Sequence, residues 1–308
     1  MALLCFLLAP TDPAYTLSAM EKVICFGETM WDCLPKGLFL GGAPFNVACH
    51  LRRLGCRPAV FSAVGNDFLG DEAIERARIS GLDTFFINKL SAFPTGVAKV
   101  NLDASGLASY TFPEPCAWDR IELKEGARKE LSKAEAILFG SLAMRSESNA
   151  DLLESILSET RALRIFDVNL RPPYHDRLSI LTQAQQADVL KVNEDELSYL
   201  SNMAFTSDTL EEAIGAVASY TGVRKICVTL GAEGAVYFDG KQIITATAPM
   251  VTVRDTVGAG DAFTAAITAG LLRDEKPEVL LEQACKLGTY VASQDGALPP
   301  YDPNEIYP

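Results

Sequence analysis

The sequence has few of the residues on which several kinds of catalytic site depend. Its 308 residues include only two histidines, His50 and His175, which makes histidine-based chemistry an improbable theme. Its eight cysteines occur singly, with no Cys-x-x-Cys pair, and most lie inside apolar stretches. This pattern argues against a disulfide framework and a zinc site, and it is typical of a reduced, cytoplasmic chain.

Positive charge and long apolar runs are also scarce. The net charge is −13, which argues against a nucleic-acid or anionic-membrane partner, because clustered Lys and Arg bind phosphate groups. Residues 1–10 are apolar, but this run is too short to span a bilayer and lacks the basic start of a signal peptide. We therefore expect residues 1–20 to be an extension outside the fold, with one domain over residues 21–308.

The phosphate-binding pattern Gly-x-x-x-x-Gly-Lys-Ser/Thr is absent, so it cannot account for nucleotide binding. What the chain does contain is apolar residues, at 48%, arranged as short runs separated by helical patterns. This alternation predicts βαβ units and a parallel sheet, with ligands bound beyond the carboxyl ends of the strands. Strands are expected at residues 23–27, 58–64, 137–140, 164–168, 189–192 and 225–230, and a hairpin at residues 96–112.

Small residues lie where the helical pattern at Phe263 begins. At Gly258, Ala259 and Gly260, several backbone N–H groups can converge on an anion at the positive end of the helix dipole. Asp261 would then take a proton from an attacking hydroxyl group while the amides hold the charge of a transferring phosphoryl group. The alternative is an ordinary helix start, in which Asp261 only favours the dipole.

A second glycine pair, Gly41 and Gly42, precedes Pro44 and another helical pattern. Proline suits the first turn of a helix, which would also contain Asn46. Glycines let a polar ligand approach the backbone closely, and an asparagine can donate to and accept from a hydroxyl group. The alternative is a tight turn followed by a helix start.

Two segments resemble the two signatures of the ribokinase-like, or PfkB, family of carbohydrate kinases. Residues 41–48 resemble the first signature and residues 255–265 the second, in the order of the family. The resemblance implies a three-layer α/β sandwich with a mainly parallel central sheet and a small β-sheet lid, whose strands lie around residues 33–42 and 96–113. It also implies a kinase that uses ATP and Mg²⁺, with K⁺ as a further cation in many members, and it allows a homodimer through the lid.

The resemblance also implies roles for individual residues. In the family, an aspartate after the first strand binds sugar hydroxyl groups, and an arginine after a later strand lies near the phosphates. The matching residues here are Asp32 and Arg171. Sugar binding would involve Asp32, Gly41, Gly42, Asn46 and Arg171, and catalysis would involve Gly258, Ala259, Gly260 and Asp261.

The nucleotide and cation sites follow from the same resemblance. Asn193 and Glu196 match a family motif that organises magnesium and its waters, although their spacing is also a helix capping box. The implied nucleotide-binding residues are Asn169, Lys191, Asn193, Glu196, Thr229, Gly231, Gly234, Gly260 and Cys285. The implied ligands of a monovalent cation are Asp255, Val257, Val291, Gln294 and Gly296.

Among sugars, D-fructose is our first expectation, because residues 41–44 and 167–173 look most like the fructokinase forms of these segments. One alternative is 2-keto-3-deoxygluconate, a sugar acid that Arg171 could serve. Another is a catalytically silent relative that binds nucleotide or a partner. Such a relative would be expected to lose the base or the glycines, whereas Asp261, Gly258 and Gly260 are all present.

Overall fold

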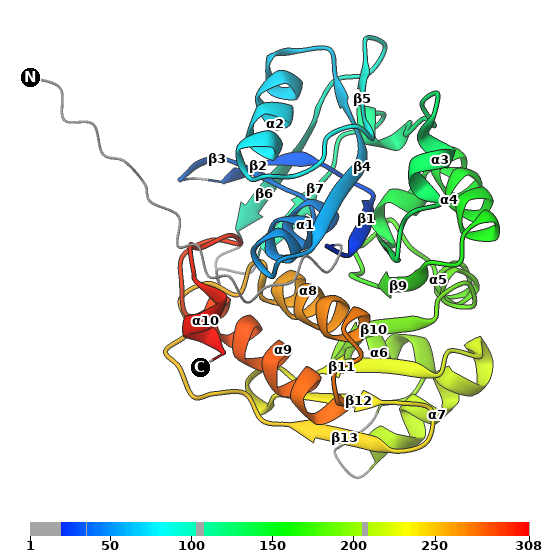
Figure 1. Ribbon diagram of the computed structural model, residues 1–308, viewed down its shortest axis with the longest axis vertical. Helices are drawn as coiled ribbons and strands as arrows, with labels where there is room; N and C mark the ends of the chain where they lie inside the picture. Colours follow the sequence, from blue (N-terminus) through cyan, green and yellow to red (C-terminus); the bar gives the residue numbers. More distant parts are fainter. Residues whose placement is uncertain (1–19, 35, 103–107, 205–208, 308) are drawn as a thin grey trace, which may run out of the picture.

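The computed structural model describes residues 20–34, 36–102, 108–204 and 209–307. They form an α/β structure with two separate sheets (Figure 1). Residues 1–19, which belong to the expected extension, lie outside the described residues, as do residues 103–107 within the expected hairpin.

The larger sheet has nine strands in the order β13-β12-β11-β10-β9-β8-β1-β4-β5. The strands from β11 to β5 in this order run parallel to one another, and β12 and β13 add an antiparallel edge. The strands expected from the apolar runs are confirmed as β1 (Lys22–Phe26), β4 (Arg57–Gly65), β8 (Ala136–Gly140), β9 (Leu163–Asp167), β10 (Val189–Asn193) and β11 (Lys225–Thr229). The others are β5 (Ile87–Leu90), β12 (Ala235–Phe238) and β13 (Ile243–Ala246).

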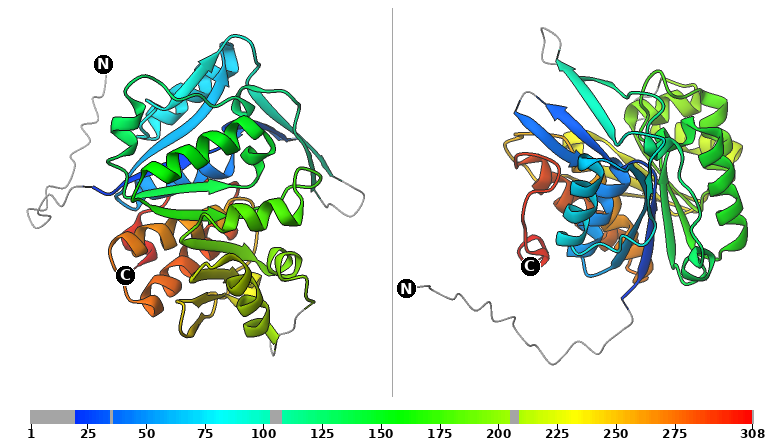
Figure 2. Two further views of the ribbon diagram at one scale, coloured as in Figure 1. Left: turned by 90° about the vertical axis from the view of Figure 1, so that its right-hand side faces the viewer. Right: turned by 90° about the horizontal axis from the view of Figure 1, so that it is seen from above.

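Helices cover both faces of this sheet, which gives the predicted three layers (Figure 2). One face carries α1 (Ala43–Arg53), α2 (Phe68–Ile79), α8 (Ala259–Leu272) and α9 (Pro277–Ala292). The other carries α3 (Ala127–Leu131), α4 (Glu147–Glu159), α5 (Arg177–Ala184), α6 (Glu194–Ser201) and α7 (Leu210–Thr221), and α10 (Pro303–Ile306) lies near the C-terminus. Among the residues that the structure describes, no helix is long and apolar enough to cross a membrane.

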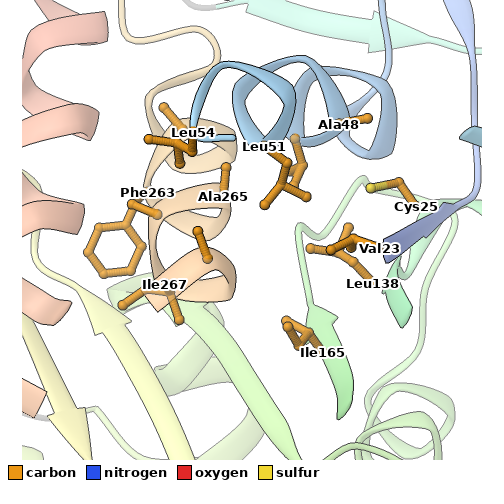
Figure 3. Packing of buried hydrophobic residues seen from close by; sticks show 14 of the residues in the cluster. Val23, Cys25, Ala48, Leu51, Leu54, Leu138, Ile165, Phe263, Ala265 and Ile267 are labelled. Atoms are coloured by element: carbon orange, nitrogen blue, oxygen red, sulfur yellow. The ribbon is translucent and has the colours of Figure 1, made fainter. Parts of the chain in front are cut away.

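The core is divided into two by the central sheet. Val23 and Cys25 of β1 belong to the cluster shared with α1 and α8, whereas Ile24 and Phe26 belong to the cluster on the opposite face. Alternate residues of one strand are therefore buried on both sides, as expected for a parallel sheet between two helix layers. Figure 3 shows the first cluster, in which Leu51 of α1 lies near α8. This packing places the first turns of the two helices at one end of the sheet.

The smaller sheet has four strands in the order β3-β2-β6-β7. They are β2 (Met30–Leu34), β3 (Gly37–Gly41), β6 (Gly96–Leu102) and β7 (Ala108–Thr111). β2 pairs with β3 antiparallel and with β6 parallel, and β6 and β7 form the expected hairpin. Two chain segments that are distant in sequence thus meet at β2, which carries Asp32. The small sheet projects beyond the larger one (Figure 2).

Asp67 holds the start of β6 against α2 through hydrogen bonds. As the N-cap of α2 it accepts a hydrogen bond from the Gly70 amide at 2.8 Å. It also accepts from the Thr95 amide at 2.9 Å and from the Thr95 hydroxyl at 2.6 Å, and Thr95 directly precedes β6. Burial alone would raise the pKa of Asp67, but these hydrogen bonds hold it below its ordinary value.

We expect Asp67→Ala to lower the free energy of unfolding by about 2 kcal/mol at pH 7, because it removes a helix cap and leaves Thr95 without its acceptor. The folded-state pKa of Asp67 is depressed, so its stabilisation is complete above the unfolded pKa of about 4 and is lost as the pH falls through the folded value. Urea unfolding at pH 7 and pH 3 measures both effects.

The matched control is Asp71→Ala in the same helix, where Asp71 forms only an exposed ion pair with Lys89. We expect this control to cost less than about 1 kcal/mol. Equal costs for the two variants at pH 7, or a cost for Asp67→Ala that does not decrease between pH 7 and pH 3, would contradict the assigned role of Asp67.

Candidate active site

Polar side chains gather at the carboxyl ends of the central strands. β9 ends at Asp167, β10 contains Lys191 and ends at Asn193, and β11 ends at Thr229. These parallel strands are direct neighbours, so their carboxyl ends share one edge of the sheet. Ligands of open α/β sheets bind at such an edge.

Asp261, in the first turn of α8, contacts Asn46 in the first turn of α1. Asn46 Nδ2 donates a hydrogen bond to Asp261 Oδ2 at 2.8 Å, across 215 positions of sequence. Asn46 is buried and Asp261 is half-buried. The structure therefore brings together the two glycine-containing segments that the sequence singled out, and it does so through their polar side chains.

The surroundings of Asp261 change its acidity. Burial raises its pKa to about 6, and the negative charge of Asp167 adds to this rise. The hydrogen bond from Asn46 and the positive charges of Lys191 and Arg171 act in the opposite direction. At neutral pH the carboxylate is mostly ionised, and its pKa is close enough to neutrality for it to exchange a proton with a ligand.

The start of α8 leaves two amides without a backbone acceptor among the described residues, those of Gly260 and Asp261. The amide of Ala259 instead donates to Thr256 O at 3.3 Å. Gly258, the N-cap, has a φ of 79°, and a Cβ atom there would lie 2.5 Å from Ala297 Cα, so no other residue fits without strain. The free amides lie at the positive end of the helix, where an anion is favoured.

A buried ion pair lies beneath this helix start. Lys191 Nζ is 3.1 Å from Asp167 Oδ1, and the hydroxyl group of Thr264 donates to Asp167 Oδ2 at 2.7 Å. Burial alone would lower the pKa of Lys191, but Asp167 and Glu196 raise it above its ordinary value, so the ammonium group keeps its charge. A Cβ atom at Gly260 would lie 3.2 Å from Lys191 Nζ, which places this charge directly beside the free amides.

Glu196 joins two loops at the carboxyl edge of the sheet. Its Oε2 accepts from the Asn193 amide at 2.8 Å, and the Glu196 amide donates to Asn193 Oδ1 at 2.8 Å, which is the capping box expected from the spacing. Its Oε1 accepts from the Leu170 amide at 2.9 Å, so it also fixes the loop that contains Asn169 and Arg171. Among the described residues, no group of three or more His, Cys, Asp or Glu side chains could hold a metal ion.

Three acidic side chains lie close enough to Arg171 for its positive charge to affect their pKa values. Burial raises the pKa of Glu28 to about 7 and those of Asp32 and Asp261 to about 6, and the positive charge of Arg171 lowers all three. Asp32 lies beside Gly41, where a Cβ atom would be 2.7 Å from Asp32 Oδ2. The residues expected to bind sugar, Asp32, Gly41 and Arg171, therefore share one environment with Asp261.

The residues expected to line the nucleotide site are more scattered. Thr229 donates to Val192 O at 3.4 Å, and the exposed Gly231 begins a single-turn helix after β11. Gly234 and Cys285 both lie against the carbonyl group of Ala246, with Cys285 Sγ at 3.9 Å from its oxygen. Cys285 is buried in the core, which raises its pKa to about 11. Within the described chain, no hydrogen bond links these residues to Asp261.

The segments that carry the expected cation ligands also lie together. Asp255 Oδ1 accepts from the Val257 amide at 3.0 Å, and Asp255 Oδ2 accepts from the Gly296 amide at 3.2 Å. The Gln294 amide donates to Val291 O at 3.0 Å, at the end of α9. Asp255 thus holds the loop before α8 against the segment after α9.

Two residues of this region were not among the site residues expected from the sequence, Glu28 and Asp167. Each carboxyl group lies at or just beyond the carboxyl end of a buried strand, β1 and β9 respectively. An acidic residue at or just after the end of an apolar run can be recognised in the sequence as a candidate site residue. The partners of these groups, Ala43 and Lys191, come from other segments and could not be inferred from it.

The chain is similar to known proteins over almost its whole length. A model of the pfkB family carbohydrate kinases matches residues 15–303. A fructokinase from Rhizobium leguminosarum bv. trifolii is 30% identical over 268 residues, 82% of this chain and 80% of that protein. Fructokinase-1 from Oryza sativa subsp. japonica is 30% identical over 309 residues, 91% of this chain and 94% of that protein.

The fold is similar to that of a fructokinase from Xylella fastidiosa, whose crystal structure contains ATP. The TM-score is 0.81 at 24% sequence identity, with 92% of this chain and 97% of that chain covered. At this level of identity the similarity supports the fold.

The contact between Asn46 and Asp261 predicts a change in acidity on mutation. Asn46→Ala removes a donor that stabilises the carboxylate, so we expect the pKa of Asp261 to rise above its value of about 6. A hydrogen bond to a charged group predicts a rise of roughly one to two pH units. The titration of Asp261 can be followed by NMR of carboxyl-labelled aspartate. The control is Asn66→Ala, which removes only an exposed hydrogen bond to Ser91; an identical titration curve in both variants would contradict the assigned contact.

Proposed function

The chain belongs to the PfkB family of carbohydrate kinases, and we propose that it transfers the γ-phosphate of ATP to the primary hydroxyl group of D-fructose, forming fructose 6-phosphate. The observation that supports transfer at this site is the contact of Asn46 with Asp261 beside the free amides of Gly260 and Asp261. The relatives named fructokinases, at 30% identity, support fructose as the sugar.

In the proposed reaction, Asp261 accepts the proton of the sugar hydroxyl group while the oxygen of that hydroxyl group bonds to the γ-phosphorus atom of ATP. The bond from that phosphorus to the bridging oxygen breaks, and ADP leaves with the bond electrons. The amides of Gly260 and Asp261, together with Lys191, stabilise negative charge on the transferring group. Asp32, Gly42 and Asn46 hold the sugar, so that its hydroxyl group faces Asp261.

Magnesium, when bound with ATP, neutralises part of the charge on the phosphates. It keeps most of its waters and needs few protein oxygens, which suits a site without a dense group of carboxylates. Asn193 and Glu196 would act on it through its waters, with Glu196 held in place by the two backbone amides that donate to its carboxylate oxygens. Asp255, together with Val257 and Gly296, whose amides donate to it, would hold a potassium ion.

We also propose that two copies pair through the small sheet in the cytoplasm. Leu38 and Phe39 of β3 support this pairing, because they are 39% and 47% exposed. Sedimentation should then give twice the chain mass of 33.3 kDa, and Phe39→Lys should give the single-chain mass. A single-chain mass for the wild type would contradict this pairing and leave the kinase proposal unaffected.

The reaction itself is tested with a panel of sugars and sugar acids, assayed for ATP-dependent phosphorylation. We expect D-fructose to give the highest kcat/KM, with a primary phosphate ester as the product. A higher value for 2-keto-3-deoxygluconate would replace the sugar in this proposal with the sugar acid. A wild-type enzyme that phosphorylates no member of the panel would contradict the proposed function.

Asp261→Asn tests the base. We expect turnover to fall by roughly 10²-fold to 10⁴-fold, the contribution of a positioned acid–base group, while ATP affinity stays within about twofold. In the wild type, kcat/KM should rise with pH through about 6, because Asp261 must lose its proton before it can accept another. Asp151→Asn, on the exposed surface of α4, is the matched control. Wild-type turnover in Asp261→Asn would exclude this residue as the base.

A further inference from the structure

Glu28 is a buried carboxyl group that the proposed transfer does not use. It lies just after β1, in the turn that leads to β2, and is 3% exposed. Its Oε1 accepts a hydrogen bond from the Ala43 amide at 3.2 Å, and its Oε2 has no hydrogen-bond partner in the part of the chain that the structure describes. Burying a carboxyl group with one unpartnered oxygen costs stability, so its presence requires an explanation.

The first turn of α1 supplies part of this explanation. Its N-cap residue is Gly42, which has no side chain to accept from the free amides at the helix start. Glu28 accepts from Ala43, the first residue of α1, and therefore does from a different loop what a capping side chain usually does. A carboxyl group at this end of a helix is also favoured by the helix dipole.

The backbone around Glu28 fits closely against the same helix start. A Cβ atom at Gly42 would lie 2.4 Å from the carbonyl oxygen of Glu28, and one at Gly27 would lie 2.8 Å from Pro44 Cγ. Neither position has room for a side chain. The end of β1 and the start of α1 are thus held together by a hydrogen bond and by two close contacts, which fixes the helix relative to the sheet.

This attachment extends to the proposed base. The Asn46 amide donates to Gly42 O at 2.9 Å, which closes the first turn of α1, and Asn46 Nδ2 donates to Asp261 Oδ2 at 2.8 Å. We propose that Glu28 is a positioning residue, which fixes the first turn of α1 and thereby holds Asn46 where it orients Asp261. This inference rests on the proposed function, because it assigns Glu28 a role in the alignment of that base.

The attachment does not require Glu28 to be charged. Burial raises its pKa to about 7, the amides of Glu28 and Ala43 and the charge of Arg171 lower it, and the charge of Asp261 raises it further. A neutral carboxyl group still has a carbonyl oxygen that can accept from the Ala43 amide. Glutamine has the same length and the same carbonyl oxygen, so Glu28→Gln should keep the contact, whereas Glu28→Ala removes it.

The test measures kcat and the KM for ATP in three variants at Glu28, with each rate expressed per folded molecule from circular dichroism. We expect Glu28→Ala to lower kcat by roughly 10-fold to 100-fold through misalignment, with the KM for ATP within about twofold. Glu28→Gln should stay within about threefold of the wild type. Glu28→Asp, whose carboxyl group is too short to reach Ala43, should resemble Glu28→Ala.

A double variant tests whether the effect passes through Asn46. If it does, the kcat of the double variant Glu28→Ala with Asn46→Ala should lie within about threefold of the kcat of Asn46→Ala alone. Both changes disrupt the same alignment of Asp261, so the second adds little to the first. Independent effects would multiply instead. Asp176→Ala is the matched control, because it removes a cap from α5 on the opposite face of the sheet and should lower the melting temperature without changing kcat.

Three results would overturn the inference: an unchanged kcat in Glu28→Ala, a loss in Glu28→Gln as large as in Glu28→Ala, or multiplying effects in the double variant. If Glu28→Ala does not fold, Glu28→Asp and its combination with Asn46→Ala provide the same comparison. Failure of the proposed function has a different signature, because the wild-type enzyme would then phosphorylate no sugar.

Discussion

The hydrogen bond between Asn46 and Asp261 is the contact on which the rest of the site depends. It joins the first turns of α1 and α8, two helices that pack side by side on one face of the central sheet. Each helix start brings positive potential to the same place, and Asp261 lies between them with its carboxylate held in one orientation. The free amides of Gly260 and Asp261 can serve as an anion site because this contact fixes the end of α8.

The buried charged groups around this contact lower the free energy of unfolding, and the proposed phosphoryl transfer explains why they are present. A buried pair such as Asp167 with Lys191 can often be replaced by apolar residues with little loss of stability. What the pair provides here is a fixed positive charge on Lys191 beside Gly260. Asp167 holds this charge in place and itself accepts a hydrogen bond from Thr264, which lies on the same helix as Gly260. Glu28 is buried and Asp32 and Asp261 are half-buried, and this reduced exposure to solvent strengthens the electrostatic interactions at the site.

Local patterns in the sequence were sufficient for the central strands, for the start of α8 and for the capping box of Asn193 with Glu196, because each is set by residues close in the chain. Contacts between distant segments could not be predicted. The partner of Asp261 lies 215 positions away, and the cap of α1 comes from the end of β1. β5 was missed because only four residues of modest apolar character form it. Nor does the sequence indicate that the Ala259 amide is occupied by Thr256.

The position of Asp32 in the small sheet has a consequence for the hydrolysis of ATP by water. β2 is paired with β3 on one side and with β6 on the other, so Asp32 is fixed to the small sheet. Asp261 lies in α8, which belongs to the helical layer of the large sheet. The spacing of these two carboxyl groups therefore depends on how the sheets are held relative to each other. An alcohol that contacts both would align them, while water, which is too small to do so, would not. In the proposed reaction, a preference for an alcohol over water would then follow from the placement of Asp32 and Asp261 on parts of the fold that belong to two different sheets.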